Sequence, residues 1–287
     1  MKKLADELIQ IVAEEISRIV PKCLGVTLGG SRAYGLEDSI SDVEMYFYSY
    51  NGTPALNDIN DCLKKLQASH KRCDQFLWNS APWGPHSFFV IDGLYFEIGY
   101  RNILEIEEKL KYYQDGNVAP IQDCHDLGLG YMMSGLAASI ASEKILLSTG
   151  DELIKLKKQA QLFPDNLIKA LKKEYLDTAR ELLNGKLLAA AKREDIFCYD
   201  VISNRIVRCL FVMAYALSKK HFPGDKWNEP LIKRSNWSKK EAFLRCLKDH
   251  SLNKAQNTKE LLLRREYLVQ AIFMIDETLE EKNGPPV

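Results

Sequence analysis

The hydrophobic pattern of this chain changes once, near residue 103, and that change limits the folds open to it. Before this point short apolar runs alternate with turns, whereas after it almost every segment repeats apolar residues at helical spacing. We therefore expect an α+β first part, with a mixed sheet flanked by helices, followed by an all-helical second part. Glycine and proline within residues 116–120 mark the boundary and predict domains at 1–118 and 119–287.

The individual elements follow from the same periodicities. In the first part the pattern predicts helices over residues 4–20 and 56–67, strands at Cys23–Leu28 and Asp42–Ser49, and a hairpin from His86 to Tyr100. The dipeptide Asp92-Gly93, typical of tight hairpin turns, separates the two apolar runs of that hairpin. In the second part it predicts helices over residues 165–183, 197–219, 238–248 and 256–281.

Composition argues against several classes of function. The 39 basic and 39 acidic residues cancel, so the chain lacks the long-range field that attracts polyanions, and nucleic acid is not expected as its main partner. No apolar run reaches the roughly 20 residues that span a bilayer, and the first residues do not read as a signal peptide. The 7 cysteines are odd in number and show no C-x-x-C spacing. We expect a cytoplasmic protein without a membrane segment, a disulfide framework or a zinc site.

Acidic residues on two of the expected strands point to a metal site. Asp42 and Glu44 are two positions apart, so they project from one face of their strand while their apolar neighbours face the core. Glu97 occupies the corresponding polar position on the second strand of the hairpin. Like charges held this close need a compensating cation, and oxygen ligands suit Mg²⁺. If the two strands are neighbours, the three carboxylates can hold two metal ions for a displacement at phosphorus.

The turn that precedes these acids has the composition of a phosphate-binding loop. In Gly29-Gly30-Ser31 the glycines permit close backbone approach to a phosphate and the serine hydroxyl can donate to it, while Arg32 adds positive charge. A glycine-serine turn is by itself more often structural, and an Asp-x-Glu pair on an edge strand is more often a solvated face. The combination of turn, paired acids and third acid favours a nucleotide site.

The runs Gly30-Ser31-Arg32-Ala33-Tyr34-Gly35 and Ser41-Asp42-Val43-Glu44 resemble the signature of the DNA polymerase β-type nucleotidyltransferase superfamily. Within it the chain is most similar to the antibiotic-modifying aminoglycoside and lincosamide nucleotidyltransferases and their relatives, although many of those carry arginine where this chain has Tyr34. The resemblance implies that Asp42, Glu44 and Glu97 bind Mg²⁺ and that Gly30 and Ser31 hold the nucleoside triphosphate. The neighbouring Gly29, Arg32 and Ser41 are further candidates for contacts with the nucleotide.

The resemblance also implies a reaction. The expected activity is transfer of AMP from ATP, or of another nucleoside monophosphate, to a hydroxyl of a small acceptor such as an aminoglycoside or lincosamide. In the related enzymes a carboxylate on the first long helix of the second domain accepts the hydroxyl proton, which corresponds here to Asp177, with Glu174 as the alternative. Two other interpretations remain open: an antitoxin-like nucleotidyltransferase that acts on or binds a protein or RNA partner, and a non-catalytic nucleotide-binding module.

Overall fold

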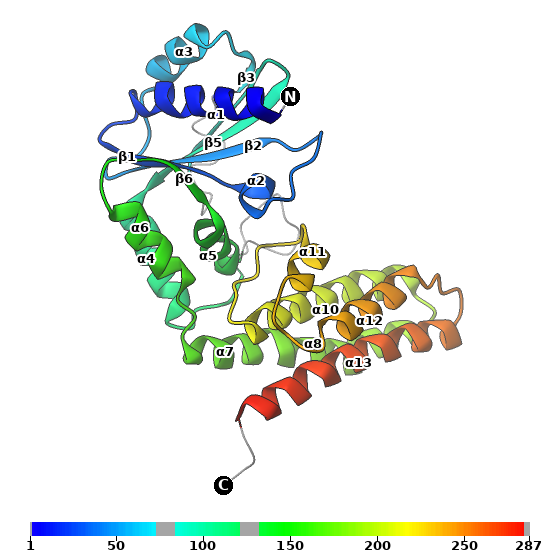
Figure 1. Cartoon of the computed structure of the whole chain (residues 1–287). Coiled ribbons are helices and arrows are strands. Elements are labelled where there is room, and N and C mark those ends of the chain that lie inside the picture. Colours follow the sequence, from blue (N-terminus) through cyan, green and yellow to red (C-terminus); the bar gives the residue numbers. More distant parts are fainter. Residues whose placement is uncertain (1, 73–83, 121–131, 284–287) are drawn as a thin grey trace. The chain divides into compact units, whose positions relative to one another are not determined.

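The chain has an α+β fold, as its hydrophobic pattern predicts, and divides into two compact units (Figure 1). The computed structural model describes residues 2–72, 84–120 and 132–283. The first unit comprises Met1–Tyr112 and Leu136–Leu162, and the second comprises Tyr113–Gly135 and Phe163–Val287. The expected domain boundary at residue 118 stays a prediction. Each of the two units contains residues from both sides of that position.

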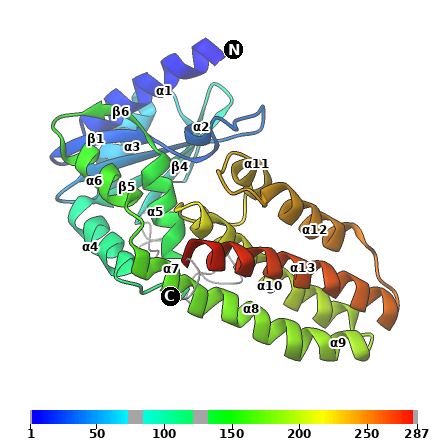
Figure 2. The same cartoon turned by 60° about the horizontal axis from the view of Figure 1, so that its bottom comes forward.

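The first unit is built on a six-stranded sheet in the order β3-β4-β5-β2-β1-β6. Its strands are β1 (Cys23–Leu28), β2 (Val43–Ser49), β3 (Ser69–Arg72), β4 (His86–Ile91), β5 (Leu94–Asn102) and β6 (Lys144–Ser148). The central pair β2 and β5 is parallel, and the other neighbouring strands are antiparallel, which makes the sheet mixed. Both views of the ribbon show helices packed around this sheet (Figure 2).

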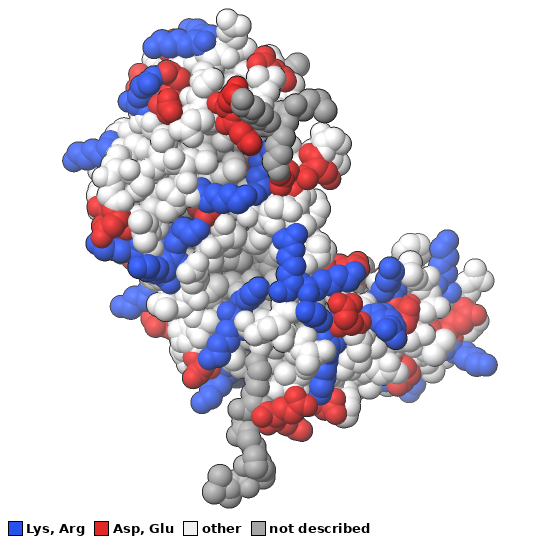
Figure 3. Space-filling model, in the orientation of Figure 1, with Lys and Arg blue, Asp and Glu red and all other residues white. Residues whose placement is uncertain are grey.

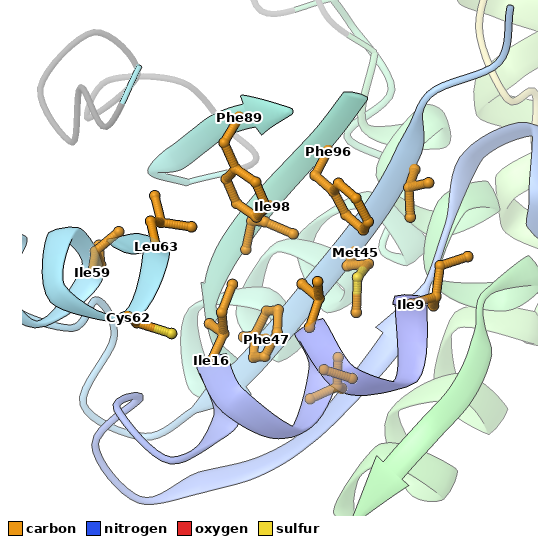
Figure 4. Packing of buried hydrophobic residues seen from close by; sticks show 14 of the residues in the cluster. Ile9, Ile16, Met45, Phe47, Ile59, Cys62, Leu63, Phe89, Phe96 and Ile98 are labelled. Atoms are coloured by element: carbon orange, nitrogen blue, oxygen red, sulfur yellow. The ribbon is translucent and has the colours of Figure 1, made fainter. Parts of the chain in front are cut away.

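Apolar residues of β1, β2, β4 and β5 face a core that is closed by two helices (Figure 4). The helices that lie wholly or mostly in the first unit are α1 (Lys2–Ser17), α2 (Gly30–Tyr34), α3 (Leu56–Lys65), α4 (Ile103–Gln114), α5 (Met133–Ser142) and α6 (Glu152–Gln161). The side chains of Ile16 on α1 and Leu63 on α3 pack with Phe47 of β2, and each of the three is at most 1% exposed. One face of the sheet is therefore filled, and the functional groups must lie elsewhere.

The predicted hairpin is confirmed, including its two-residue turn. Strand β4 ends at Ile91 and β5 begins at Leu94, and the register pairs these two residues. Asp92 and Gly93 both have positive φ, at 48° and 79°. This conformation matches the twist of the flanking strands and is tolerated by aspartate and glycine.

Two strands were not predicted. The expectation of helix alone beyond residue 103 is wrong at Lys144–Ser148, because this segment forms β6 and pairs with β1 at the edge of the sheet. Its run Ile145-Leu146-Leu147 is too short for periodicity to separate a strand from a helix. Strand β3 is only four residues long and mostly polar, so it carries no alternation to detect.

The second unit is helical, and the four helices predicted for it are confirmed with shifts of a few residues, except that the first continues well beyond residue 183. Its elements are α7 (Asp165–Leu171), η1 (Lys172–Leu176), α8 (Asp177–Leu182), η2 (Leu183–Leu187), α9 (Leu188–Lys192), α10 (Ile196–Leu217), α11 (Asn228–Lys233), α12 (Lys240–Leu252) and α13 (Thr258–Asn283). The stretch 165–192 is helical throughout and includes two π-helical turns. Buried hydrogen bonds link distant helices, for example from Tyr199 Oη to the carbonyl oxygen of Leu261, at 2.9 Å.

Charged side chains of both signs are interspersed on each unit in the face shown in Figure 3. This distribution agrees with the formal net charge of zero. Among the residues that the structure describes, none of the helices combines the length and the apolar character that crossing a membrane requires.

Candidate functional site

The second face of the sheet is polar, in contrast to the face that α1 and α3 cover. Because side chains alternate along a strand, the buried core residues of β2 leave Glu44, Tyr46 and Tyr48 on this face. Strand β5 runs parallel to β2 and places Glu97 opposite Glu44 and Arg101 opposite Tyr48. The polar face thus carries two carboxylates at one end and an arginine further along.

Glu44 and Glu97 are directly paired across the two central strands. Paired strands lie about 4.8 Å apart, so the two carboxylates are brought close on one face. Both residues are partly buried, with the Glu97 side chain 30% exposed. Asp42 lies two positions before Glu44, and the residue between them, Val43, is fully buried in the core. The register thus brings Glu44 and Glu97 together, whereas the place of Asp42 in a common site with them stays a prediction.

The glycine-serine turn approaches Glu44 from the end of β1. The Gly29 amide donates to the carbonyl oxygen of Glu44, at 2.8 Å. Gly30 has a φ of 55°, and a Cβ there would lie 2.5 Å from the Glu44 carboxylate. Any other residue at position 30 would be strained and would push that carboxylate aside. Gly30 thus has a reason to be glycine that does not depend on a bound phosphate.

Ser31 has an unusual environment for a polar side chain. It is 6% exposed, and its Oγ has no hydrogen-bond partner among the residues that the structure describes. A buried hydroxyl without a partner costs about 1–3 kcal/mol, so such groups are uncommon unless a ligand or water completes them. This orphaned hydroxyl, in the residue that follows Gly30, is the feature that most directly indicates a bound ligand.

Arg32 and Ser41 are predicted to contact the nucleotide, and the side chains of both donate hydrogen bonds within the protein. Nε of Arg32 donates to the carbonyl oxygen of Asp42, at 3.2 Å, and so holds the start of β2. The hydroxyl of Ser41 donates to Asp38 Oδ1, at 2.7 Å, in an exposed turn. Their roles toward a nucleotide stay predictions.

A pocket opens beside Arg32 and Ser41, with a volume of about 630 Å³. Most of its wall is apolar, with acidic residues among the polar ones; it is lined by Leu4, Ala5, Glu7, Leu8, Ile11, Arg32, Glu37, Asp38, Ser39, Ser41, Asp92 and Leu94. This size lies within the range that small-molecule ligands occupy. A ligand in this pocket would lie next to the segment that leads into Asp42.

His86 flanks Glu97 and is neutral. It is 2% exposed, and loss of hydration lowers the pKa of its imidazole to about 4. Its Nδ1 lies 2.8 Å from the carbonyl oxygen of Gly84, which places the proton on Nδ1 and leaves Nε2 as an acceptor. Nε2 is 3.6 Å from Oε1 of Glu97, so the two atoms are not an ion pair at neutral pH. Two acceptors that face each other favour a cation or a donor between them.

Further along the polar face lies a buried ion pair. Arg101 and Glu143 are 3% and 0% exposed, and Nη1 of Arg101 lies 2.7 Å from Oε1 of Glu143. The Glu143 carboxylate also accepts hydrogen bonds from Thr27, Tyr48 and Ser139, at 2.7 to 2.9 Å. This complete set of donors offsets the cost of burying the charge.

Glu44 and Glu97 offer oxygen ligands of the kind that Mg²⁺ prefers. Within residues 2–72, 84–120 and 132–283, no three acidic, histidine or cysteine side chains are arranged to hold a metal ion by themselves. Mg²⁺ typically keeps several waters and binds through one or two carboxylates together with substrate phosphates. The paired carboxylates of Glu44 and Glu97 are compatible with that mode, in which substrate phosphate and water would complete the coordination.

The two candidates for the catalytic base lie in the second unit. Asp177 opens α8, and its Oδ1 accepts from Nη1 of Arg180 at 2.8 Å. Arg180 also pairs with Asp276 of α13. Glu174 lies in η1 and is partly buried. Asp177 is therefore part of an ion-pair cluster within its own unit, and its role as a base stays a prediction.

Sequence reasoning missed several residues of the polar face. Tyr46 was detectable, because its position two residues after Glu44 puts it on the same face by alternation. His86 and Glu143 carry no such signal: the first shows no ligand spacing, and the second is 42 residues from its partner Arg101 in the chain. His86 and Glu143 reach the polar face through tertiary structure: the first through the pairing of β4 with β5, and the second because β6, which follows it, pairs with β1.

Comparisons with known proteins give a partial family match and similarity to a distant solved structure. Residues 132–228 match the model of a family described as a domain of unknown function, DUF4037. No curated protein matches the chain. The chain is similar to the crystal structure of a nucleotidyltransferase-like protein from Exiguobacterium sibiricum 255-15, with 10% sequence identity and a TM-score of 0.43. That match covers 96% of this chain and 79% of the other.

Proposed function

We propose that this chain is a Mg²⁺-dependent nucleotidyltransferase that transfers a nucleoside monophosphate, AMP from ATP, to a hydroxyl of a small molecule. The observation that carries the proposal is a set of three features at one end of the central strands β2 and β5. Glu44 and Glu97 are paired across β2 and β5, Gly30 lies against the Glu44 carboxylate, and the Ser31 hydroxyl is buried without a partner among the described residues. Carboxylates and an available donor are the groups that a metal-bound triphosphate requires.

The chemistry assigned to this site is an in-line displacement. The acceptor oxygen forms a bond to the α-phosphorus, the bond from that phosphorus to the bridging oxygen breaks, and pyrophosphate leaves with the electron pair. Two Mg²⁺ ions bound by Asp42, Glu44 and Glu97 would neutralise charge on the attacking and leaving oxygens. Ser31 would donate to a phosphate oxygen, and a base takes the hydroxyl proton.

The acceptor class is the finer part of the proposal. The resemblance of the motif residues favours a hydroxylated small molecule, with aminoglycosides and lincosamides as the first candidates. Pyrophosphate release from ATP and Mg²⁺ should be measured with a panel of these antibiotics and of other hydroxylated metabolites. Release that depends on one acceptor supports the proposal. Labelled AMP found on a protein or an RNA, with none on any small molecule, would replace it with the antitoxin-like activity.

Replacement of Ser31 by alanine is expected to weaken ATP binding without lowering the stability of the fold. The variant should bind ATP about tenfold more weakly or worse, because a hydrogen bond to a charged group contributes about 1.5–3 kcal/mol. Its thermal unfolding temperature should stay unchanged or rise, because the lost hydroxyl has no partner among the described residues. Calorimetric titration with ATP and Mg²⁺ and thermal unfolding measure the two effects.

The matched control for Ser31→Ala is Ser87→Ala in the same sheet. Ser87 is also buried, but its hydroxyl lies 3.2 Å from the hydroxyl of Tyr100. Removal of this hydroxyl should lower the unfolding temperature and leave ATP affinity unchanged. If Ser31→Ala instead behaves like the control, the hydroxyl has no role toward the nucleotide.

For the base we propose Asp177, with Glu174 as the alternative. Substitution of the true base by its amide, tested as Asp177→Asn and Glu174→Gln separately, should lower kcat about a hundredfold with an identified acceptor. The same variant should lose the acidic limb of the kcat–pH profile, since that limb reports the base in the bound complex. The proposed role of this helix would be withdrawn if both variants kept the wild-type kcat and pH profile.

A further inference from the structure

The ring of Tyr46 lies between two glycines, Gly29 after β1 and Gly99 on β5. A Cβ on Gly29, at the end of β1, would lie 2.4 Å from Cε2 of Tyr46. A Cβ on Gly99 of β5 would lie 2.7 Å from Cδ1 on the other side of the ring. The ring is therefore confined laterally, and two glycines make its position possible.

The face of the same ring is covered by Arg101. The guanidinium carbon of Arg101 lies 3.5 Å from the centroid of the Tyr46 ring, within the range of a cation–π contact. Arg101 is itself fixed by the ion pair with Glu143 and donates to the Tyr48 hydroxyl, at 2.6 Å. A buried arginine that is held by this ion pair has few other rotamers open to it, so it holds the ring more rigidly than a solvated arginine would.

The hydroxyl end of Tyr46 reaches the candidate metal site. It donates to Oε2 of Glu44, at 3.0 Å. The donated hydrogen bond fixes one oxygen of the carboxylate, while the other part of the group lies against Gly30.

We propose that Tyr46 is a positioning residue for the metal site: its hydroxyl holds the Glu44 carboxylate in the orientation that binds the ion, and the pair of Arg101 and Glu143 holds its ring. The inference rests on the proposed function, because it gives Glu44 the role of metal ligand. Hydrogen bonds to a ligating carboxylate orient it, and their loss typically lowers metal affinity 10- to 100-fold.

Two tyrosines on one strand provide a matched test. Tyr46 and Tyr48 are both buried and lie on the same face of β2, but the Tyr48 hydroxyl donates to Glu143 rather than to Glu44. Tyr46→Phe and Tyr48→Phe each remove one hydroxyl and keep the ring. The probe is Mn²⁺ alone, titrated into the full chain and followed by the electron paramagnetic resonance signal of the free ion, with thermal unfolding measured in parallel.

The expected results differ in kind between the two variants. Tyr46→Phe should raise the Kd for Mn²⁺ about 10- to 100-fold and leave the unfolding temperature nearly unchanged. Tyr48→Phe should keep the Kd within about twofold of wild type and lower the unfolding temperature, because the carboxylate of Glu143 loses a buried donor.

Other outcomes overturn the inference in distinguishable ways. If wild type binds Mn²⁺, Glu44→Gln abolishes binding and Tyr46→Phe keeps the wild-type Kd, then Glu44 is a ligand that Tyr46 does not position. Equal weakening by both tyrosine variants would assign the effect to general packing. If wild type and Glu44→Gln show the same weak Mn²⁺ binding, the metal site of the proposed function fails, and the positioning role fails with it.

Discussion

Asp42→Asn and Glu44→Gln are each expected to lower the rate of nucleotidyl transfer about a thousandfold or more without loss of stability. Each removes a charge that the proposed mechanism uses to bind metal ions, whose stabilisation of the transition state amounts to several kcal/mol, or about tenfold in rate per 1.4 kcal/mol. Each also removes one member of a group of like charges, so the unfolding temperature should stay or rise. Initial rates of pyrophosphate release and thermal unfolding test both statements.

Asp61→Asn is the matched control for the loss of a carboxylate. The Asp61 side chain is 68% exposed on α3, which covers the opposite face of the sheet from the paired acids. Its removal changes the net charge by the same amount and should leave the transfer rate unchanged. Wild-type turnover by a well-folded Asp42→Asn, Glu44→Gln double variant would end the metal-site hypothesis.

Local pattern was sufficient for the elements that carry the candidate site. The hairpin of β4 and β5 was predictable because Asp92-Gly93 allows a turn with positive φ at both residues. The side of β2 on which Glu44 lies was predictable because strand alternation is a local rule, and its neighbours Val43 and Met45 are buried in the core. By contrast, β6 was missed because its apolar run is short and its place at the sheet edge depends on pairing with β1.

The pairing and register of the strands could not be predicted from local sequence pattern. Glu44 meets Glu97 because β2 and β5 pair in parallel, and the register of two strands separated by a long crossover is set by tertiary packing. The same holds for Glu143, which reaches the polar face only because α5 and β6 return to the sheet. The sequence predicts which residues are available, whereas the fold decides which of them meet.

The glycines of the signature illustrate this difference. Sequence reasoning assigned Gly29 and Gly30 to close approach of a phosphate, whereas the structure shows two protein groups that already require them. A side chain at Gly29 would collide with the Tyr46 ring, and one at Gly30 would collide with the Glu44 carboxylate. A glycine-rich turn thus serves the orientation of the acids as well as access for a ligand, and the two requirements favour the same residues.

Glu143→Gln is expected to cause the largest loss of stability among the substitutions considered. The glutamine keeps the size of the side chain but leaves the charge of Arg101, which is 3% exposed, without its counterion. Removal of one partner of a buried ion pair typically costs about 3–5 kcal/mol. Urea unfolding followed by circular dichroism should show this fall in the free energy of unfolding.

A double-mutant cycle isolates the interaction energy between Arg101 and Glu143 from the contacts that each makes with other residues. Arg101→Met alone should cost less than Glu143→Gln, because Thr27, Tyr48 and Ser139 still donate to the Glu143 carboxylate. The double variant should be less destabilised than the sum of the two single variants, since no buried charge is then left without its partner.

An exposed ion pair in the same unit is the control for this cycle. Lys155 lies 2.9 Å from Asp151, and the two side chains are 69% and 64% exposed. Lys155→Met should leave the free energy of unfolding unchanged within error, because solvent screens such pairs. If Glu143→Gln is as stable as Lys155→Met, the buried pair does not hold the polar face of the sheet. Tyr46 would then need another support for the ring that Arg101 covers.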